Sequence, residues 1–214
     1  LAHEIKNPLT PIQLSIDRLQ EKFYNKVLDG KDEFKNYLTT INRQIKDIEN
    51  LVNEFSSFAR MPSPVFKKIK IDSVIQRAVD FYKMSSLNKI NFKILKKKTN
   101  INGDEEQLYR VFINLIKNSE DSILIKREKN IDFKGKISVE IVDNNDYTAI
   151  TLIDNGIGIK DATKIMTPYF TTKKNGTGLG LPIVTKIINE HLGDIVITDN
   201  QPGAKVLINL PVIK

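Results

Sequence analysis

Residues 154–158 read Asp-Asn-Gly-Ile-Gly and residues 176–181 read Gly-Thr-Gly-Leu-Gly-Leu, and these two glycine-rich stretches are the most informative part of the sequence. A dinucleotide-binding fingerprint would need a third glycine where Leu181 stands, and a strand directly before its first glycine. A Lys-Lys-Asn segment precedes Gly176 instead, which excludes that fold. The second stretch opens an expected helix, and the N–H groups at a helix start favour phosphate oxygens.

The chemistry of the first stretch suits ATP. Asp154 ends an expected strand, where its carboxylate can accept a hydrogen bond from an exocyclic amine such as that of adenine. Gly156 and Gly158 let the backbone turn closely under the base. Two unrelated glycine turns are the alternative, and each stretch alone leaves that alternative open.

Two asparagines share one face of a helix expected at residues 105–125. Asn114 and Asn118 are four residues apart, which places them on neighbouring turns. Mg²⁺ is a hard ion that takes few protein oxygens besides substrate phosphates and waters, so an amide oxygen suits it without adding negative charge against ATP. For this helix considered alone, two solvent-facing amides are the simpler interpretation.

The segments after residue 64 predict an α/β sandwich of one mixed sheet and one helical layer, because strand runs are interrupted by whole helices. The segment at about residues 155–178 is too long for a simple connection and is typical of a lid or binding loop. The strands are expected at residues 65–71, 90–95, 136–142, 149–154, 194–198 and 205–210, and the helices at residues 72–84, 105–125 and 179–190.

A different pattern fills the first 62 residues. Apolar residues recur at alternating steps of four and three, which is typical of the heptad seam of a coiled coil or four-helix bundle. An earlier helix is expected at residues 1–26, with a turn at residues 28–32. Two helices cannot bury their seams alone, so we expect a homodimer in which four helices form a bundle. The seam residues are Phe34, Leu38, Ile41, Ile45, Ile48, Val52, Phe55 and Ala59.

One histidine in the first helix is distinguished by its neighbours. The imidazole of His3 is a competent nucleophile toward a phosphoryl group, and Glu4 can take its proton or orient the ring. Asn7 lies one turn further on the same face, and Pro8 with Pro11 should bend the helix just past the histidine. A lone exposed histidine is more often without function, and His191 keeps that interpretation.

Composition favours an ordinary globular protein. No apolar run approaches the roughly 18 residues of a membrane-spanning helix, and the sequence contains no cysteine for disulfides or thiolate metal sites. The net charge of +7 comes largely from dispersed lysines without interleaved aromatic residues, so no nucleic-acid partner is expected. Because the chain begins at Leu1 inside an expected helix, we expect a part of a longer protein whose remaining part holds a sensor or membrane spans.

Taken together, these segments resemble the sensor histidine kinases of two-component systems, whose sequence boxes follow one another in the same order over the whole chain. The helix pair, with residues 53–62, is most similar to nitrogen-regulation sensor kinases of the NtrY type. The matching positions are His3, Glu4 and Asn7 for the H-E-x-x-N box, Asn114 and Asn118 for the asparagine box, residues 154–158 and 176–181 for the two glycine boxes, and residues 168–173 for the phenylalanine box.

The resemblance implies a domain architecture and a reaction. Residues 1–62 would be a dimerisation and phosphotransfer hairpin, and residues 65–214 an ATP-binding domain of the histidine kinase, gyrase and chaperone ATPase type. ATP would phosphorylate His3, and the phosphoryl group would pass to an aspartate of a response regulator docked on residues 11–19. Asn7 would orient a water for the reverse reaction. The chain would be the cytoplasmic part of a protein anchored in the bacterial inner membrane.

The resemblance also implies the residues of the ATP site. Asn118, with Asn114 near it, would hold Mg²⁺, and residues 155–178 would form the lid. The implied ATP-contacting residues are Asn114, Asn118, Asp154, Gly156, Gly158, Lys160, Phe170, Thr171, Thr172, Lys173, Gly176, Thr177, Gly178, Leu179, Gly180 and Leu181.

The asparagine box departs from the family pattern, because Ser119, Asp121 and Ser122 stand where small residues, often alanine, are usual. Two alternatives to a kinase stay open. A gyrase-, mismatch-repair- or chaperone-type ATPase would need an acidic water activator where Asn114 stands, and would lack the hairpin that bears His3. A kinase-dead dimeric scaffold would only sense nucleotide or bind the regulator, although every box residue needed for chemistry is present.

Overall fold

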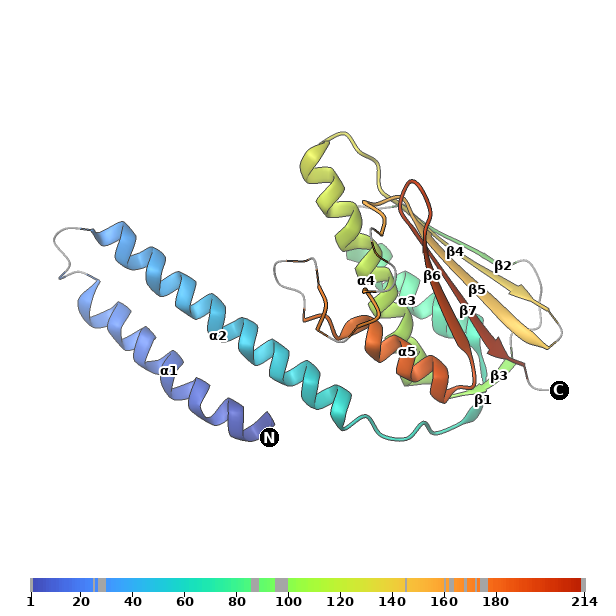
Figure 1. Ribbon diagram of the computed structural model, residues 1–214, viewed down its shortest axis with the longest axis horizontal. Coiled ribbons are helices and arrows are strands. Elements are labelled where there is room, and N and C mark those ends of the chain that lie inside the picture. The colour runs from blue at the N-terminus through green and yellow to red at the C-terminus, as the bar shows by residue number, and fades with distance from the viewer. Residues whose placement is uncertain are drawn as a thin grey trace. The chain divides into compact units, whose positions relative to one another are not determined.

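The computed structural model divides the chain into two compact units, Leu1–Pro62 with Thr171–Leu179 and Ser63–Phe170 with Gly180–Lys214 (Figure 1). No helix in the described part is long and apolar enough to cross a membrane. The structure describes residues 2–24, 26, 30–85, 89–94, 100–144, 146–159, 161, 164–167, 169–171, 173 and 177–212. Among these, only the backbone is described for residues 2–8, 57, 85 and 89–94.

A helical hairpin forms most of the first unit. Helix α1 (Ala2–Phe23) packs against α2 (Lys31–Ala59), and α1 continues through both of its prolines as a single helix. The side-chain amide of Gln13 donates to Oδ1 of Asn42 at 3.1 Å, which fixes the register of the two helices. The bend expected past His3 stays a prediction.

The heptad seam divides between two sides of α2. Leu38, Ile45 and Val52, seven residues apart, are only 4–5% exposed, and the first two form a core with α1. The alternate members Ile41 and Ile48 are each 44% exposed. One row of the seam is therefore covered within the hairpin, and the other row is open to a further partner.

The second unit is built on a five-stranded sheet with the strand order β2-β4-β5-β7-β6. Strand β2 is parallel to β4, and the remaining neighbours are antiparallel, so the sheet is mixed. Three helices, α3, α4 and α5, form the layer beside this sheet (Figure 1). The α/β sandwich expected from the sequence is confirmed. The bounds are α3 Ile71–Ser85, β2 Lys89–Ile94, α4 Glu105–Lys129, β4 Lys136–Asp143, β5 Tyr147–Asp154, α5 Gly180–Glu190, β6 Asp194–Asp199 and β7 Ala204–Pro211.

The expectation of a single sheet was wrong in one respect. Strand β1 (Lys67–Lys70) leaves the main sheet and pairs antiparallel with β3 (Asn100–Gly103) in a small second sheet. Strand β3 was missed because Asn-Ile-Asn-Gly has little β-propensity and only one large apolar side chain. That side chain, Ile101, is 1% exposed, so its burial in the core fixes the strand.

Helix α4 begins at a strong cap and is longer than expected. The carboxylate of Asp104 accepts hydrogen bonds from the backbone N–H groups of Glu106 and Gln107, satisfying two donors of the first turn. The helix ends at Lys129 rather than at residue 125, and its last turn carries basic side chains that suit the negative end of the helix dipole. Its buried face anchors it in the centre of the unit.

Candidate active site

One face of α4 carries a row of polar side chains four residues apart. Asn114, Asn118, Ser122 and Lys126 are all partly buried, at the border between the core and solvent. The amide group of Asn114 donates to the Arg110 carbonyl at 2.9 Å, which directs its Oδ1 away from that carbonyl. The two predicted asparagines thus begin a row that continues along the helix.

The start of α5 approaches the first of these asparagines. A Cβ atom added to Gly180 would lie 3.4 Å from Oδ1 of Asn114, so a side chain at this position would press on the amide. The first residues of α5 have N–H groups without partners inside the helix, which suits phosphate oxygens. The predicted residues Asn114 and Gly180, 66 positions apart in the numbering, are therefore neighbours in the fold.

Asp154 is the last residue of β5, and its side chain is 4% exposed. Its Oδ1 accepts hydrogen bonds from the backbone N–H groups of Gly156 at 2.8 Å and Ala204 at 3.3 Å. Burial raises the pKa of this carboxyl above its ordinary value, although these hydrogen bonds, one from the Ser119 hydroxyl and the charge of Lys126 act in the opposite direction.

The glycines of the first box are required by close packing within the protein. A Cβ at Gly156 would lie 2.8 Å from both the Cβ and the carbonyl carbon of Ser122. Gly158 has φ 75°, a conformation that side chains with a Cβ rarely adopt, and a Cβ there would lie 2.5 Å from Oδ1 of Asp199. The expectation that these glycines bring the backbone close to a base stays a prediction.

Sequence reasoning missed three residues that shape this loop. The Ser119 hydroxyl donates to Asp154, Ser122 accepts a hydrogen bond from Ile157, and Lys126 donates to two loop carbonyls. The signal for Ser122 and Lys126 was available, because they continue the four-residue spacing of the two asparagines. In the sequence alone, Ser119 and Ser122 stand out only as departures from alanine.

The predicted lid is described in part. Its described residues contain neither helix nor strand, in agreement with a loop, and Gly178 has φ 70°. The Phe170 N–H donates to the Thr167 carbonyl at 3.2 Å, and the Lys173 N–H to the Thr171 hydroxyl at 3.1 Å. Leu179 is buried, and Thr177 and Leu181 are partly exposed. The predicted residues Lys160, Thr172 and Gly176 lie outside the described residues.

His3, Glu4 and Asn7 lie in the first two turns of α1, and only their backbone is described. His3 and Asn7 are four residues apart in a continuous helix and therefore share one face. These residues belong to the first compact unit, whereas Asn114, Asn118 and Asp154 belong to the second.

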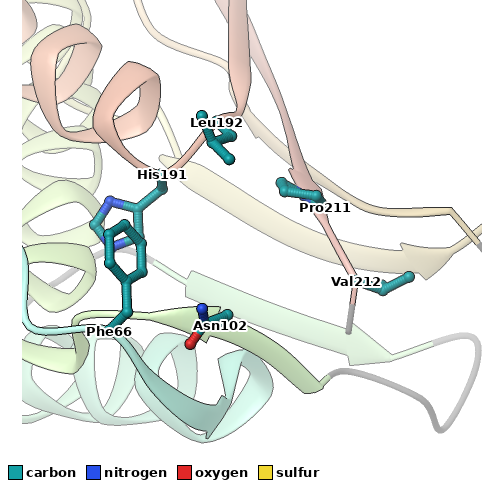
Figure 2. A pocket seen from close by; sticks show the side chains of 6 residues that line it. All are labelled: Phe66, Asn102, His191, Leu192, Pro211 and Val212. Atoms are coloured by element: carbon teal, nitrogen blue, oxygen red, sulfur yellow. The ribbon is translucent and has the colours of Figure 1, made fainter. Parts of the chain in front are cut away.

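A hollow of about 370 Å³ in the second unit lies away from this site (Figure 2). Figure 2 shows the rings of Phe66 and His191 next to each other on one side, tilted by 60°, with Leu192, Pro211 and Val212 on the other. His191 follows the last residue of α5, and the helix has 11 residues, so the hollow is roughly 16 Å from the start of α5.

His191 has a packing role, whereas the sequence interpretation had grouped it with exposed histidines. It is 2% exposed, its Nε2 accepts the N–H of Asp104 at 2.9 Å, and its Nδ1 lies 2.7 Å from the Ile187 carbonyl. Asp104 in turn accepts the N–H of Val65 at 2.9 Å. His191 therefore joins the end of α5 to the beginning of α4, beside the segment that leads into β1.

The donor set near Asn118 suits a hard divalent ion that is shared with a nucleotide. No group of three or more His, Asp or Glu side chains in the described residues could hold a metal by itself. Asn114 and Asn118 offer neutral amide oxygens, which would leave most of the coordination to phosphates and water.

Two families match the sequence. The family described as histidine kinase-, DNA gyrase B- and HSP90-like ATPase matches residues 103–214, and the His Kinase A phospho-acceptor domain matches residues 1–64. The class defined by the fold and the site is thus an ATPase-type α/β sandwich joined to a phospho-acceptor hairpin.

Curated relatives agree with this class. The chain is 37% identical over 215 residues to a putative NtrY-like sensor histidine kinase of Rickettsia felis, covering 97% of this chain and 34% of the relative. It is 36% identical over 212 residues to the nitrogen regulation protein NtrY of Azorhizobium caulinodans, covering 98% of this chain and 27% of the relative. The chain belongs to the sensor histidine kinases and, as the sequence predicted, is similar to those of the NtrY type.

Solved structures share the fold. The catalytic domain of histidine kinase ThkA has a TM-score of 0.60 and 25% identity, covering 69% of this chain and 95% of that chain. A complex of ThkA with the response regulator protein TrrA has a TM-score of 0.69 and 24% identity, covering 99% of this chain and 60% of that chain. The second match shows likeness of fold over nearly the whole chain.

Proposed function

We propose that this chain is the ATP-dependent protein-histidine kinase core of a two-component sensor, which phosphorylates its own His3. The observation that carries the proposal is the meeting of three elements in the second unit. On α4, Asn114 lies beside Gly180 at the start of α5, and Ser119 donates to the buried Asp154 at the end of β5. The same chain carries His3 on a helix whose family is described as phospho-acceptor.

The nucleotide would be held by its base and its phosphates. Asp154 would accept the exocyclic amine of adenine, with Gly156 and Gly158 under the base. The N–H groups at the start of α5 would bind phosphate oxygens, and residues 155–178, including Lys160, Phe170 and Lys173, would close over ATP. Asn118 and Asn114 would hold Mg²⁺, which when bound neutralises charge on the phosphates.

Phosphoryl transfer follows from positioning. A ring nitrogen of His3 attacks the γ-phosphorus in line, the new N–P bond forms, and the bond from phosphorus to the bridging oxygen breaks to release ADP. Glu4 accepts the ring proton or orients the imidazole. The phosphoryl group then passes to an aspartate of a response regulator, and Asn7 orients a water for dephosphorylation of that regulator.

The partners and the domain boundaries belong to the same proposal. The open seam row with Ile41 and Ile48 supports a homodimer, because two hairpins would cover each other's exposed apolar residues. A response regulator as partner is suggested by the ThkA complex, whose partner is a response regulator protein, and we propose residues 11–19 as its docking surface. We assign residues 1–62 to the hairpin domain and residues 65–214 to the ATP-binding domain.

The location in the cell is likewise proposed. The chain spans 34% and 27% of the lengths of the two curated relatives described above. We propose that it is the cytoplasmic part of a longer protein anchored in the bacterial inner membrane.

ATP binding is the first test of the proposal. Equilibrium dialysis with labelled ATP and Mg²⁺ should give one site per chain, and Asn118→Asp should weaken binding strongly, because it brings a negative charge against the phosphates. Lys117→Gln, an exposed neighbour on the same helix, serves as the control and should leave binding unchanged. Equal binding by Asn118→Asp and the unsubstituted chain would contradict the magnesium assignment.

A further inference from the structure

The loop that carries the first glycine box is fastened to α4 by a lysine. The ammonium group of Lys126 donates to the carbonyl oxygens of Asn155 at 2.7 Å and Gly156 at 2.8 Å. Its Nζ also lies 4.6 Å from the centroid of the Phe133 ring, so the ammonium group itself rests over an aromatic face. Both hydrogen bonds come from a charged donor and are therefore of the stronger kind.

Ser122 makes a second connection one turn earlier on the same helix. Its hydroxyl oxygen accepts the N–H of Ile157 at 3.0 Å. Because Gly156 has no side chain, the loop backbone can lie directly against Ser122. A Cβ atom at Gly156 would overlap with Ser122. Three consecutive loop residues are thus bonded to the side of α4.

These connections reach Asp154 through a single hydrogen bond. The Gly156 carbonyl accepts a hydrogen bond from Lys126, and the N–H of the same residue donates to the Asp154 carboxylate. The same helix carries Asn114 and Asn118 further toward its beginning. Beside the direct hydrogen bond from Ser119, Lys126 and Ser122 therefore help to hold the base-binding carboxylate in position relative to the asparagine face.

We infer that Lys126 and Ser122 are positioning residues for adenine recognition, because they hold the loop of Asp154 on α4. The inference rests on the proposed ATP site. A carboxylate favours adenine, which presents an amine, over guanine, which presents a carbonyl oxygen in the corresponding place. A firmly held carboxylate increases the difference in affinity between the two bases, because it cannot move away from the guanine oxygen. In a loosened loop the carboxylate can turn away from that oxygen, so the preference for adenine falls.

The test measures affinity for two nucleotides. Mg²⁺–ATP and Mg²⁺–GTP are titrated into the whole chain carrying Lys126→Met, which keeps the apolar stem and removes the donors. ATP affinity should fall about tenfold, while GTP affinity should change much less, so that the preference for ATP falls. Lys126→Arg, which retains the charged donors, should restore most of the preference.

Two further variants keep the outcome decisive. Ser122→Ala removes one hydroxyl and should lower the ATP preference by about threefold, with little risk to folding. Lys129→Met changes an exposed lysine in the last turn of the same helix and should behave as the unsubstituted chain. An unchanged ATP preference in both Lys126→Met and Ser122→Ala would overturn the inference.

Other outcomes also discriminate. Equal losses of ATP and GTP affinity with a lower melting temperature would assign Lys126 a structural role only and overturn the inference. If the unsubstituted chain binds ATP while the variants match it, the proposed function survives and the inference fails. If the unsubstituted chain binds no ATP, both fail.

Discussion

Oδ1 of Asp154 lies 2.8 Å from the backbone nitrogen of Gly156 and accepts its hydrogen bond. The N–H of Ala204, the first residue of β7, donates to the same oxygen. The carboxylate that we assign to adenine is therefore fixed by backbone donors from two segments. A base bound there would meet an acceptor whose orientation is already set, which reduces the cost of ordering it.

Asp154→Asn should lower the affinity for ATP without lowering the stability of the fold. The asparagine keeps one acceptor for Gly156 but loses the charge, so ATP affinity should fall by roughly ten- to a hundredfold. Because burial raises the pKa of Asp154, removing this charge should leave the melting temperature unchanged or raise it. Calorimetric titration and thermal unfolding check the two effects.

The control for this variant is another buried carboxylate at a strand end. Asp143 is the last residue of β4 and is 6% exposed. Asp143→Asn should leave ATP affinity within about twofold of the unsubstituted chain. Similar affinity losses in both variants would remove the special role given to Asp154.

ATP binding should weaken on acidification at a pH above that expected for an ordinary aspartate. The ionised carboxylate is the form that accepts the adenine amine, and burial raises the pKa of Asp154 above 3.8. Affinity is therefore lost as pH falls through this raised pKa. Binding isotherms over a series of acidic buffers give the step, and its persistence in Asp154→Asn would contradict the assignment.

Acid has the opposite effect on the contribution of Asp154 to folding stability, which grows as pH falls. The native state holds this proton more tightly than the unfolded chain does. The contribution of Asp154 to stability is therefore full below the ordinary pKa and is lost as pH rises through the raised value.

Asp104→Ala should destabilise the second unit by about 2 kcal/mol, because it removes the cap of α4. The carboxylate accepts three backbone N–H groups, those of Val65, Glu106 and Gln107. Asp104→Asn retains one side-chain oxygen and should cost less. Urea unfolding measures both values, and equal stability of Asp104→Ala and the unsubstituted chain would rule out this role.

Acid should also weaken the Asp104 cap of α4. Burial tends to raise the pKa of Asp104, but its hydrogen bonds and His191 outweigh burial and lower it. The stability from Asp104 is therefore present above the ordinary carboxyl pKa and is lost as pH falls through the lowered value.

Ile48→Asp should prevent dimer formation. Ile48 is 44% exposed on the open row of the seam, and a charge there would be buried by a second hairpin. Asn50→Asp, an exposed position on the opposite face of α2, supplies the matched control and should remain dimeric. Sedimentation velocity gives the oligomeric state, and a dimeric Ile48→Asp would show that the open row is not the interface.

Regular patterns in the sequence were sufficient for most of the fold. The heptad spacing predicted both helices of the hairpin, and the order of strands and helices predicted the sandwich. The splitting of the seam into a covered row and an open row was beyond prediction, because it depends on the angle at which α1 meets α2. Strand β3 was missed because its stability comes from the burial of Ile101 rather than from local propensity.

The candidate site was predicted as a set of motifs, but not as a set of contacts. The spacing of Asn114 and Asn118 predicted that they share one face of α4. It could not show that Gly156 packs on Ser122, or that Lys126 reaches two loop carbonyls, because these depend on how β5 meets α4. The hydrogen bond from Ser119 to Asp154 was likewise beyond prediction, because it depends on the fold bringing the two residues together.

Transfer of the γ-phosphoryl group to His3 is measured most directly with γ-labelled ATP and Mg²⁺. We predict that the unsubstituted chain acquires a label that is stable in alkali and lost in acid, as a phosphohistidine is, and that His3→Gln acquires none. Label of the same kind and amount in His3→Gln, or no label in a chain that binds ATP, would contradict histidine kinase activity at His3.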